Sequence, residues 1–142
     1  MRITRPADEV WSVVGRPELL HHWFPGIVDC RVDGASRTIV TGTGQEMAEE
    51  ILTNDAIQRR FQYRITSRLF RDHLGTIDVI DLGDDTCLVV YATDADPATM
   101  AITIAGGTRG ALLELQRQME AGSGPALDAR DADAAVDRAE VA

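Results

Sequence analysis

The sequence contains no lysine at all, because each of its 14 basic residues is arginine. This absence excludes Schiff-base chemistry and a lysine general base, since both need a lysine amine. Cysteine is also scarce, with only Cys30 and Cys87, which lie far apart. Neither belongs to a C-x-x-C pair or a cysteine–histidine cluster. We therefore interpret both as small buried residues in a reducing compartment.

Long hydrophobic runs are missing too. No stretch approaches the roughly 20 apolar residues of a membrane-spanning helix, and the N-terminus has no apolar core of the kind found in secretory signals. We therefore predict a cytoplasmic protein without a membrane span. The 142 residues have the size of one domain, and a formal net charge of −9 makes a nucleic-acid partner improbable, because phosphate binding needs clustered positive charge.

The longest helical pattern runs from Asp96 to about Ala121. Asp96 has the side chain of an N-cap, and Pro97 suits the first helical position. Apolar and small residues recur at steps of three or four, while the opposite side is polar. The stripe comprises Ile104, Thr108, Ala111, Leu112, Leu115 and Met119, and the polar side comprises Arg109, Glu114, Arg117 and Gln118. Such a helix needs a cover, and the segments before it favour strands, so we expect it to pack on a sheet.

Two short helices and six strands are predicted before this helix. The helices start at Pro6 and Pro17, and the strands cover residues 27–32, 37–41, 45–53, 57–65, 74–82 and 86–93, with residues 1–4 as the remnant of an edge strand. The fold class is therefore α+β. Residues 126–142 carry five acids and two arginines, so we expect residues 122–142 to form a disordered acidic tail, with a marginal helix as the alternative.

Three glycines interrupt the long helix at positions 106, 107 and 110. Each weakens a helix by roughly 1 kcal/mol relative to alanine. Two explanations stay open. Either the helix backbone packs closely on the sheet, or the glycines leave space for a ligand.

Two N-terminal segments carry a recognisable pattern, namely PADEVWSVV at residues 6–14 and LHHWFPGI at residues 20–27. This pattern, with the order of strands and the terminal helix, resembles the START-like or SRPBCC superfamily, in its polyketide cyclase/dehydrase-like branch, over residues 1–121. The resemblance implies a Bet v 1-like helix-grip fold, in which a curved antiparallel sheet wraps a long C-terminal helix and two short helices close one end. It also implies an apolar cavity for lipids, sterols, polyketides or aromatic hormones.

Candidate ligand-binding residues follow from their positions in this arrangement. They are Trp23, Phe24, Phe61, Tyr63, Leu69, Phe70, Tyr91, Met100, Ile104, Leu112 and Leu115. Ordinary core packing explains the same residue types. Only unfilled volume between these side chains would distinguish a ligand cavity from a packed core.

Four residues are candidates for handling protons: His73, Tyr63, Tyr91 and Asp78. His73 follows Asp72 in a bend expected at the cavity mouth, although a surface histidine explains it as well. Tyr63 and Tyr91 offer phenol donors or are satisfied core tyrosines. The sequence contains no metal-ligand spacing, no Ser-His-Asp order and no phosphate loop, so we expect no metal and no cofactor.

Three functions stay open. The first is binding of a hydrophobic or aromatic small molecule, such as a lipid or polyketide, between sheet and helix. The second is a polyketide cyclase/dehydratase-type enzyme acting in the same cavity, and the third is a protein-interaction module. We favour binding because it requires no nucleophile or metal site, and the sequence shows neither. Whether the protein is an enzyme, and whether it is a monomer or a homodimer, stays open at this point.

Overall fold

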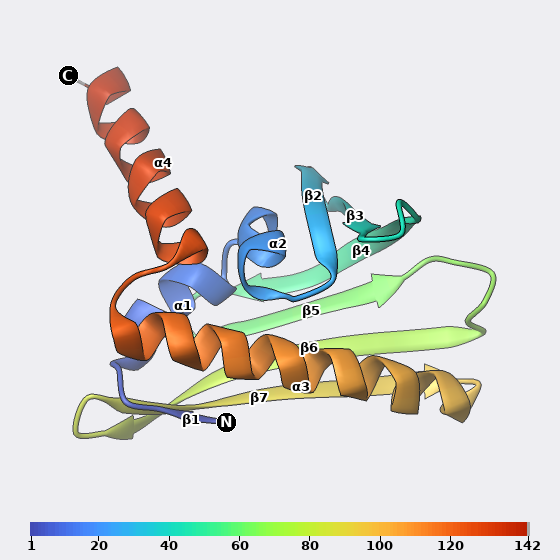
Figure 1. The fold of residues 1–142 in the computed structure, drawn as a ribbon. Coiled ribbons are helices and arrows are strands. Elements are labelled where there is room, and N and C mark those ends of the chain that lie inside the picture. The colour runs from blue at the N-terminus through green and yellow to red at the C-terminus, as the bar shows by residue number, and fades with distance from the viewer. Residues whose placement is uncertain (142) are drawn as a thin grey trace.

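The computed structural model describes residues 1–141 and contains one sheet with four helices and a 3-10 turn, η1. Figure 1 shows the chain path. The elements are β1 (Arg2–Ile3), α1 (Ala7–Val14), η1 (Pro17–Leu19), α2 (Leu20–Trp23), β2 (Ile27–Asp33), β3 (Ser36–Thr41), β4 (Glu46–Asp55), β5 (Arg60–Ile65), β6 (Asp72–Gly83), β7 (Thr86–Asp96), α3 (Ala98–Ala121) and α4 (Pro125–Val141).

The seven strands form an antiparallel sheet in the order β1-β7-β6-β5-β4-β3-β2. Strands β2 to β7 follow one another as neighbours, and β1 pairs with β7 through Arg2↔Leu88 and Ile3↔Cys87. In Figure 1, α3 runs along β6 and β7, whereas β2 lies toward the other edge beside α2. The predicted helix-grip α+β fold is confirmed.

The core lies between α3 and the inner face of the sheet. Alternate residues on the middle strands point toward it, as the two-residue period of a strand requires. Phe61, Ile77 and Val89 are each at most 2% exposed. On α3 the predicted stripe is buried at Thr108, Ala111, Leu115 and Met119 and partly buried at Ile104 and Leu112.

Some boundaries differ from the sequence prediction. β5 begins at Arg60, because the Asp55 carboxylate accepts hydrogen bonds from the backbone N–H groups of Ile57 and Gln58 and forms a turn there. Ile57 is consequently 92% exposed. Asp96 is not an N-cap, since it is the last residue of β7 and its carboxylate binds Arg71.

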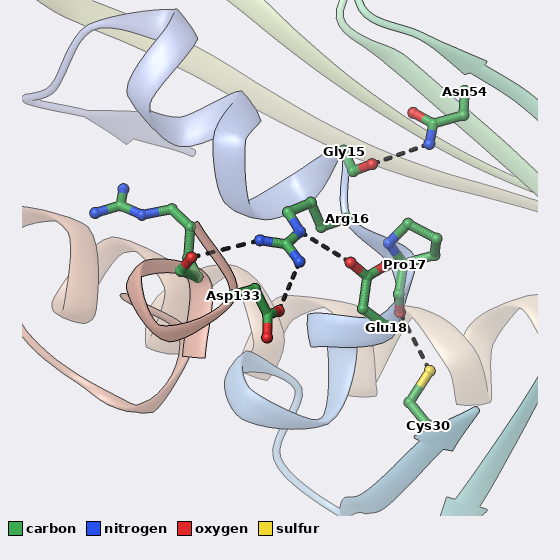
Figure 2. Close-up of polar contacts among 8 residues, drawn as sticks. Gly15, Arg16, Pro17, Glu18, Cys30, Asn54 and Asp133 are labelled. Carbon is green, nitrogen blue, oxygen red and sulfur yellow. Dashed lines mark hydrogen bonds and ion pairs between the residues drawn. The ribbon is translucent and has the colours of Figure 1, made fainter. Parts of the chain in front are cut away.

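The structure also differs from the expected disordered tail, because residues 125–141 form α4. Ala126 and Leu127 in its first turn are buried. Polar contacts then hold the helix against the N-terminal segments. Arg16 donates to Asp133 at 2.6 Å and to Glu18 at 2.8 Å, as Figure 2 shows. The contact between Arg16 and Asp133 joins distant parts of the chain, so composition alone does not reveal it. The far end of α4 extends away from the sheet (Figure 1).

Gln118 joins three helices, although the sequence pattern placed it on the polar side of α3. Its side chain is fully buried. The amide nitrogen donates to the carbonyl of His22 at 2.9 Å and to Glu114 at 2.8 Å, and the amide oxygen accepts from the N–H of Ala126 at 2.9 Å. One side chain thus satisfies backbone groups of both α2 and α4.

Replacing Gln118 with methionine should lower the free energy of unfolding by about 2–4 kcal/mol, because the His22 carbonyl and the Ala126 N–H lose their partner. Urea denaturation measures this change. Gln58→Met is the matched control at an exposed position and should stay within about 0.5 kcal/mol of the parent. Equal midpoints for Gln118→Met and the parent would contradict the role assigned to the amide.

Candidate functional site

A cavity of about 220 Å³ lies between the first half of α3 and the inner face of the sheet. Most of its wall is apolar. The lining residues are Leu20, Phe24, Pro25, Gly26, Ile27, Ile39, Thr41, Met47, Glu49, Tyr63, Ile65, Tyr91, Ile104 and Gly107. They come from α2, β2, β3, β4, β5, β7 and α3 and from the segment between α2 and β2.

The segment that leaves α2, residues 24–26, is the most exposed part of the cavity wall, and we call it the mouth. Phe24 ends the helix, and its ring meets Tyr91 edge-on with centroids 6.4 Å apart. Pro25 and Gly26 are exposed, and Gly26 has φ +90°, which side chains rarely adopt, so the turn into β2 favours glycine.

Only one of the three helix glycines is explained by the cavity. A Cβ at Gly107 would lie 3.3 Å from the Phe24 ring, so this position needs a small residue where helix and mouth approach each other. At Gly106 and Gly110 a Cβ would meet no atom within 4 Å. The structure gives no reason for glycine at those two positions.

An ion pair is buried beside the cavity. Arg37 on β3 and Glu49 on β4 are cross-strand partners, and Arg37 Nε donates to Glu49 Oε2 at 2.6 Å. The two side chains are 2% and 3% exposed. The guanidinium carbon also lies 4.8 Å from the Tyr63 ring centroid and 5.1 Å from that of Phe61, which are cation–π distances. The pair is therefore enclosed by aromatic rings.

Burial and pairing act in opposite directions on Glu49. Burial raises the pKa of Glu49 above its ordinary value, because the charged form loses hydration, while Arg37 favours the charged form. For Arg37, burial acts to lower the pKa, but Glu49 together with Tyr91 and Tyr63 outweighs it, and the pKa is raised. Arg37 therefore stays charged.

Two phenol groups meet on the same wall. The hydroxyl oxygens of Tyr63 and Tyr91 are 2.8 Å apart. Burial raises the pKa of Tyr91 to about 12 and that of Tyr63 well above its usual range, so both stay protonated and one donates to the other. Tyr63 lies over Gly75 of β6, where a Cβ would come within 2.3 Å of the ring. Gly75 thus makes room for the tyrosine.

His73 lies behind this pair and not in a bend at the mouth. It belongs to β6 and is 1% exposed. Its Nδ1 accepts the Ile65 N–H at 3.1 Å, which places the proton of the neutral ring on Nε2, and that atom has no partner among the described residues. Burial lowers the pKa of His73. Its ring is 5.4 Å from those of Tyr63 and Phe70, and His73 is not part of the cavity wall.

Asp78 is placed on the opposite face of the sheet. It is paired with Arg60 at 2.7 and 3.0 Å. Ile77 and Val79 point inward, so alternation directs Asp78 outward. This carboxylate does not reach the cavity.

The other predicted residues divide between wall, core and surface. Phe24, Tyr63, Tyr91 and Ile104 line the cavity. Trp23, Phe61 and Leu115 are fully buried core residues, Phe70 and Leu112 pack partly buried against the core, Met100 is off the wall, and Leu69 is 61% exposed. Sequence reasoning missed Arg37 and Glu49, which belong to the same strand faces as Ile39 and Met47.

No metal cluster and no membrane-spanning helix occur in the described part of the chain. No group of three or more His, Cys, Asp or Glu side chains within residues 1–141 is placed to bind a metal ion. The helices described there are also too short or too polar to cross a bilayer.

Comparison with known proteins places these features in context. Residues 1–122 match the profile of a family described as polyketide cyclase/dehydrase and lipid transport. Among curated proteins, none matches significantly. An uncharacterised protein from Bacillus thuringiensis has a similar solved structure, with 24% identity and a TM-score of 0.76, over 82% of this chain and 93% of that one.

Two further structures share the fold. The di-domain ARO/CYC protein BexL of the BE-7585A biosynthetic pathway is 21% identical with a TM-score of 0.68, over 84% of this chain and 44% of that one. A START superfamily protein from Mycobacterium smegmatis is 17% identical with a TM-score of 0.66, over 85% and 91% of the two chains.

Arg37→Met should lower the free energy of unfolding by about 3–5 kcal/mol near pH 8, because it leaves the Glu49 carboxylate buried without a partner. The loss should shrink toward pH 5. Without Arg37, the pKa of Glu49 in the folded state rises further above the ordinary 4.5. Between the two pKa values the folded variant binds a proton that the unfolded chain releases. Protonation of Glu49 therefore stabilises the folded variant at low pH, and this contribution is lost as the pH rises through the pKa of the folded state.

Urea denaturation at pH 5 and pH 8 measures both effects. The double variant Arg37→Met/Glu49→Leu serves as the control, since it removes the titrating group and should recover most of the stability without the added pH dependence. A loss for Arg37→Met that is equal at the two pH values would argue against an uncompensated buried carboxylate.

Proposed function

Since the chain belongs to the polyketide cyclase/dehydrase and lipid transport family, we propose that it binds a small apolar or aromatic molecule in the cavity between α3 and the sheet. The observation that carries this proposal is the largely apolar space of about 220 Å³ at that place. An apolar cavity of about 150 Å³ binds benzene. The cavity here therefore suits a body of one or two rings, or a short chain.

The surroundings of the cavity support the proposal. Side chains from α2, from five strands of the sheet and from α3 form one concave, largely apolar wall, as is usual for sites that bind small molecules. The segment at the mouth is exposed at Pro25 and Gly26, which provides a route from solvent. The family description and the fold shared with a START superfamily protein point in the same direction.

Methyl NMR with 2-methylnaphthalene and 2-naphthol as probes tests this binding. The δ1 methyl signals of Ile27, Ile39, Ile65 and Ile104 should shift on addition of a probe, because these side chains line the cavity. Ile80 on the outer face and Ile102, which is 77% exposed, should not shift. Shifts confined to the exposed isoleucines, or none with either probe, would overturn the proposal.

A matched pair of variants on α3 sharpens the test. Ile104→Trp places a larger side chain in the cavity and should weaken binding of either probe by about tenfold or more, since it takes volume that the ligand needs. Ile102→Trp, two residues earlier and exposed, should leave the affinity unchanged. Equal affinities for the two variants would place the binding site elsewhere.

A cyclase-type reaction is the second candidate, favoured by the polar groups that share the wall. The Tyr63 and Tyr91 hydroxyls stay protonated, and since one of them donates to the other, the second has a proton to donate to a substrate carbonyl oxygen. The Glu49 carboxylate suits acceptance of a proton from a carbon between two carbonyls. A cavity that holds a folded poly-β-ketone would then favour aldol closure by orientation. His73 and Asp78 have no part in this arrangement, because neither lines the cavity.

Turnover of a short poly-β-ketone thioester, followed by mass spectrometry, separates the two candidates. An enzyme should form a cyclised product faster than the uncatalysed reaction, and Tyr63→Phe or Tyr91→Phe should lower the rate by about a hundredfold, the usual loss for one donor to a developing oxyanion. Glu50→Gln, on the outer face of β4, should not change it. A rate equal to the uncatalysed one would leave binding alone.

A further inference from the structure

Among the residues that the structure describes, Glu49 is the single charged side chain on the cavity wall. It extends from the middle of β4 between Met47 and Ile51, which share its face of the strand. Its side chain is 3% exposed. A charge at such a depth costs free energy unless its oxygens are occupied by donors, so the partners of each oxygen decide what the carboxylate can do.

Only one of the two carboxylate oxygens has a partner among the described residues. Oε2 accepts the hydrogen bond from Arg37 Nε. Oε1 accepts none, and it is not among the fully buried atoms without a partner, so it keeps accessible surface. Because Glu49 lines the cavity, we place that surface there. A carboxylate can accept about four hydrogen bonds, so most of its capacity is open.

Arg37 fixes this carboxylate without entering the cavity. Its guanidinium lies against the rings of Tyr63 and Phe61, and it is not part of the wall. Of the two partners of the ion pair, Glu49 is the one that lines the cavity. The remaining wall is apolar apart from Thr41 and the two tyrosines.

Resting on the proposed binding function, we propose that the cavity selects aromatic alcohols and amines, whose O–H or N–H donates to Glu49 Oε1, and rejects ligands that carry a carboxylate. The donor satisfies the open oxygen while the ring fills the apolar space. A ligand carboxylate would instead place its oxygens against Glu49 Oε1, where neither group has a proton to donate, and it would lose its hydration in an apolar site.

Three naphthalene derivatives of similar size test this selectivity at pH 7 by calorimetry. 2-Naphthol carries a donor, 2-methylnaphthalene has a methyl group of similar size in its place, and 2-naphthoate carries an anion. 2-Naphthol should bind about tenfold tighter than 2-methylnaphthalene, as expected for a hydrogen bond to a charged acceptor. 2-Naphthoate should bind at least about tenfold more weakly than 2-methylnaphthalene.

Variants then assign the preference to Glu49. Arg37→Met/Glu49→Leu removes both charges and should abolish the preference for 2-naphthol while keeping binding of 2-methylnaphthalene. Glu50→Gln is the matched control on the same strand, at an exposed position, and should keep the preference. Should the double variant not fold, the order of the three ligands on the parent protein still decides the question.

The outcomes separate this inference from the function on which it rests. Equal affinities for the three ligands, or tightest binding of 2-naphthoate, would overturn the selectivity and leave cavity binding in place. No binding of any derivative would overturn the proposed function itself. Retention of the preference in a folded double variant would assign the donor contact to a group other than Glu49.

Discussion

The width of the sheet sets the main constraint on this molecule. Seven strands about 4.8 Å apart span roughly 29 Å, whereas a helix with its side chains is about 10–12 Å wide. One helix cannot cover such a sheet, and α3 packs mainly against β7 at one side. Toward β2 the sheet is covered by the short η1 and α2. The cavity is the space that these two covers leave between them.

The polar groups of the cavity wall are held by specific neighbours. Tyr63 occupies space that Gly75 leaves open, and its hydroxyl is paired with that of Tyr91. Glu49 is oriented by Arg37, which two aromatic rings enclose. Buried ion pairs contribute little net stability compared with apolar residues of the same volume. A recognition role gives a reason for this pair that stability alone does not.

Much of the fold follows from periodicity in the sequence. The α3 stripe, the strands and the short helices were predictable because each repeats apolar residues with the period of its secondary structure. Arg37 and Glu49 were missed because charged residues in strands usually face water. Yet Arg37 alternates in phase with Ile39, and Glu49 with Met47 and Ile51, so strand parity held the signal.

Other differences arise from contacts that sequence does not display. The outward side of Asp78 follows from alternation with Ile77 and Val79, but His73 required the true start of β6, two residues before the predicted one. Helix α4 depends on contacts with Ser12 and Arg16, which lie far from it along the chain, and with Gln118 near the end of α3. The local composition of that segment is polar and acidic, and it does not indicate that the segment packs against these partners.

The bonding of Gln118 has a mechanical consequence for the molecule. Its amide bonds the carbonyl of His22, which lies two residues before Phe24 at the mouth of the cavity. The same amide also bonds the first turn of α4. The mouth of the cavity and α4 are therefore joined through one side chain. A partner that displaced α4 would therefore act, through this one side chain, on the backbone that leads to the mouth of the cavity.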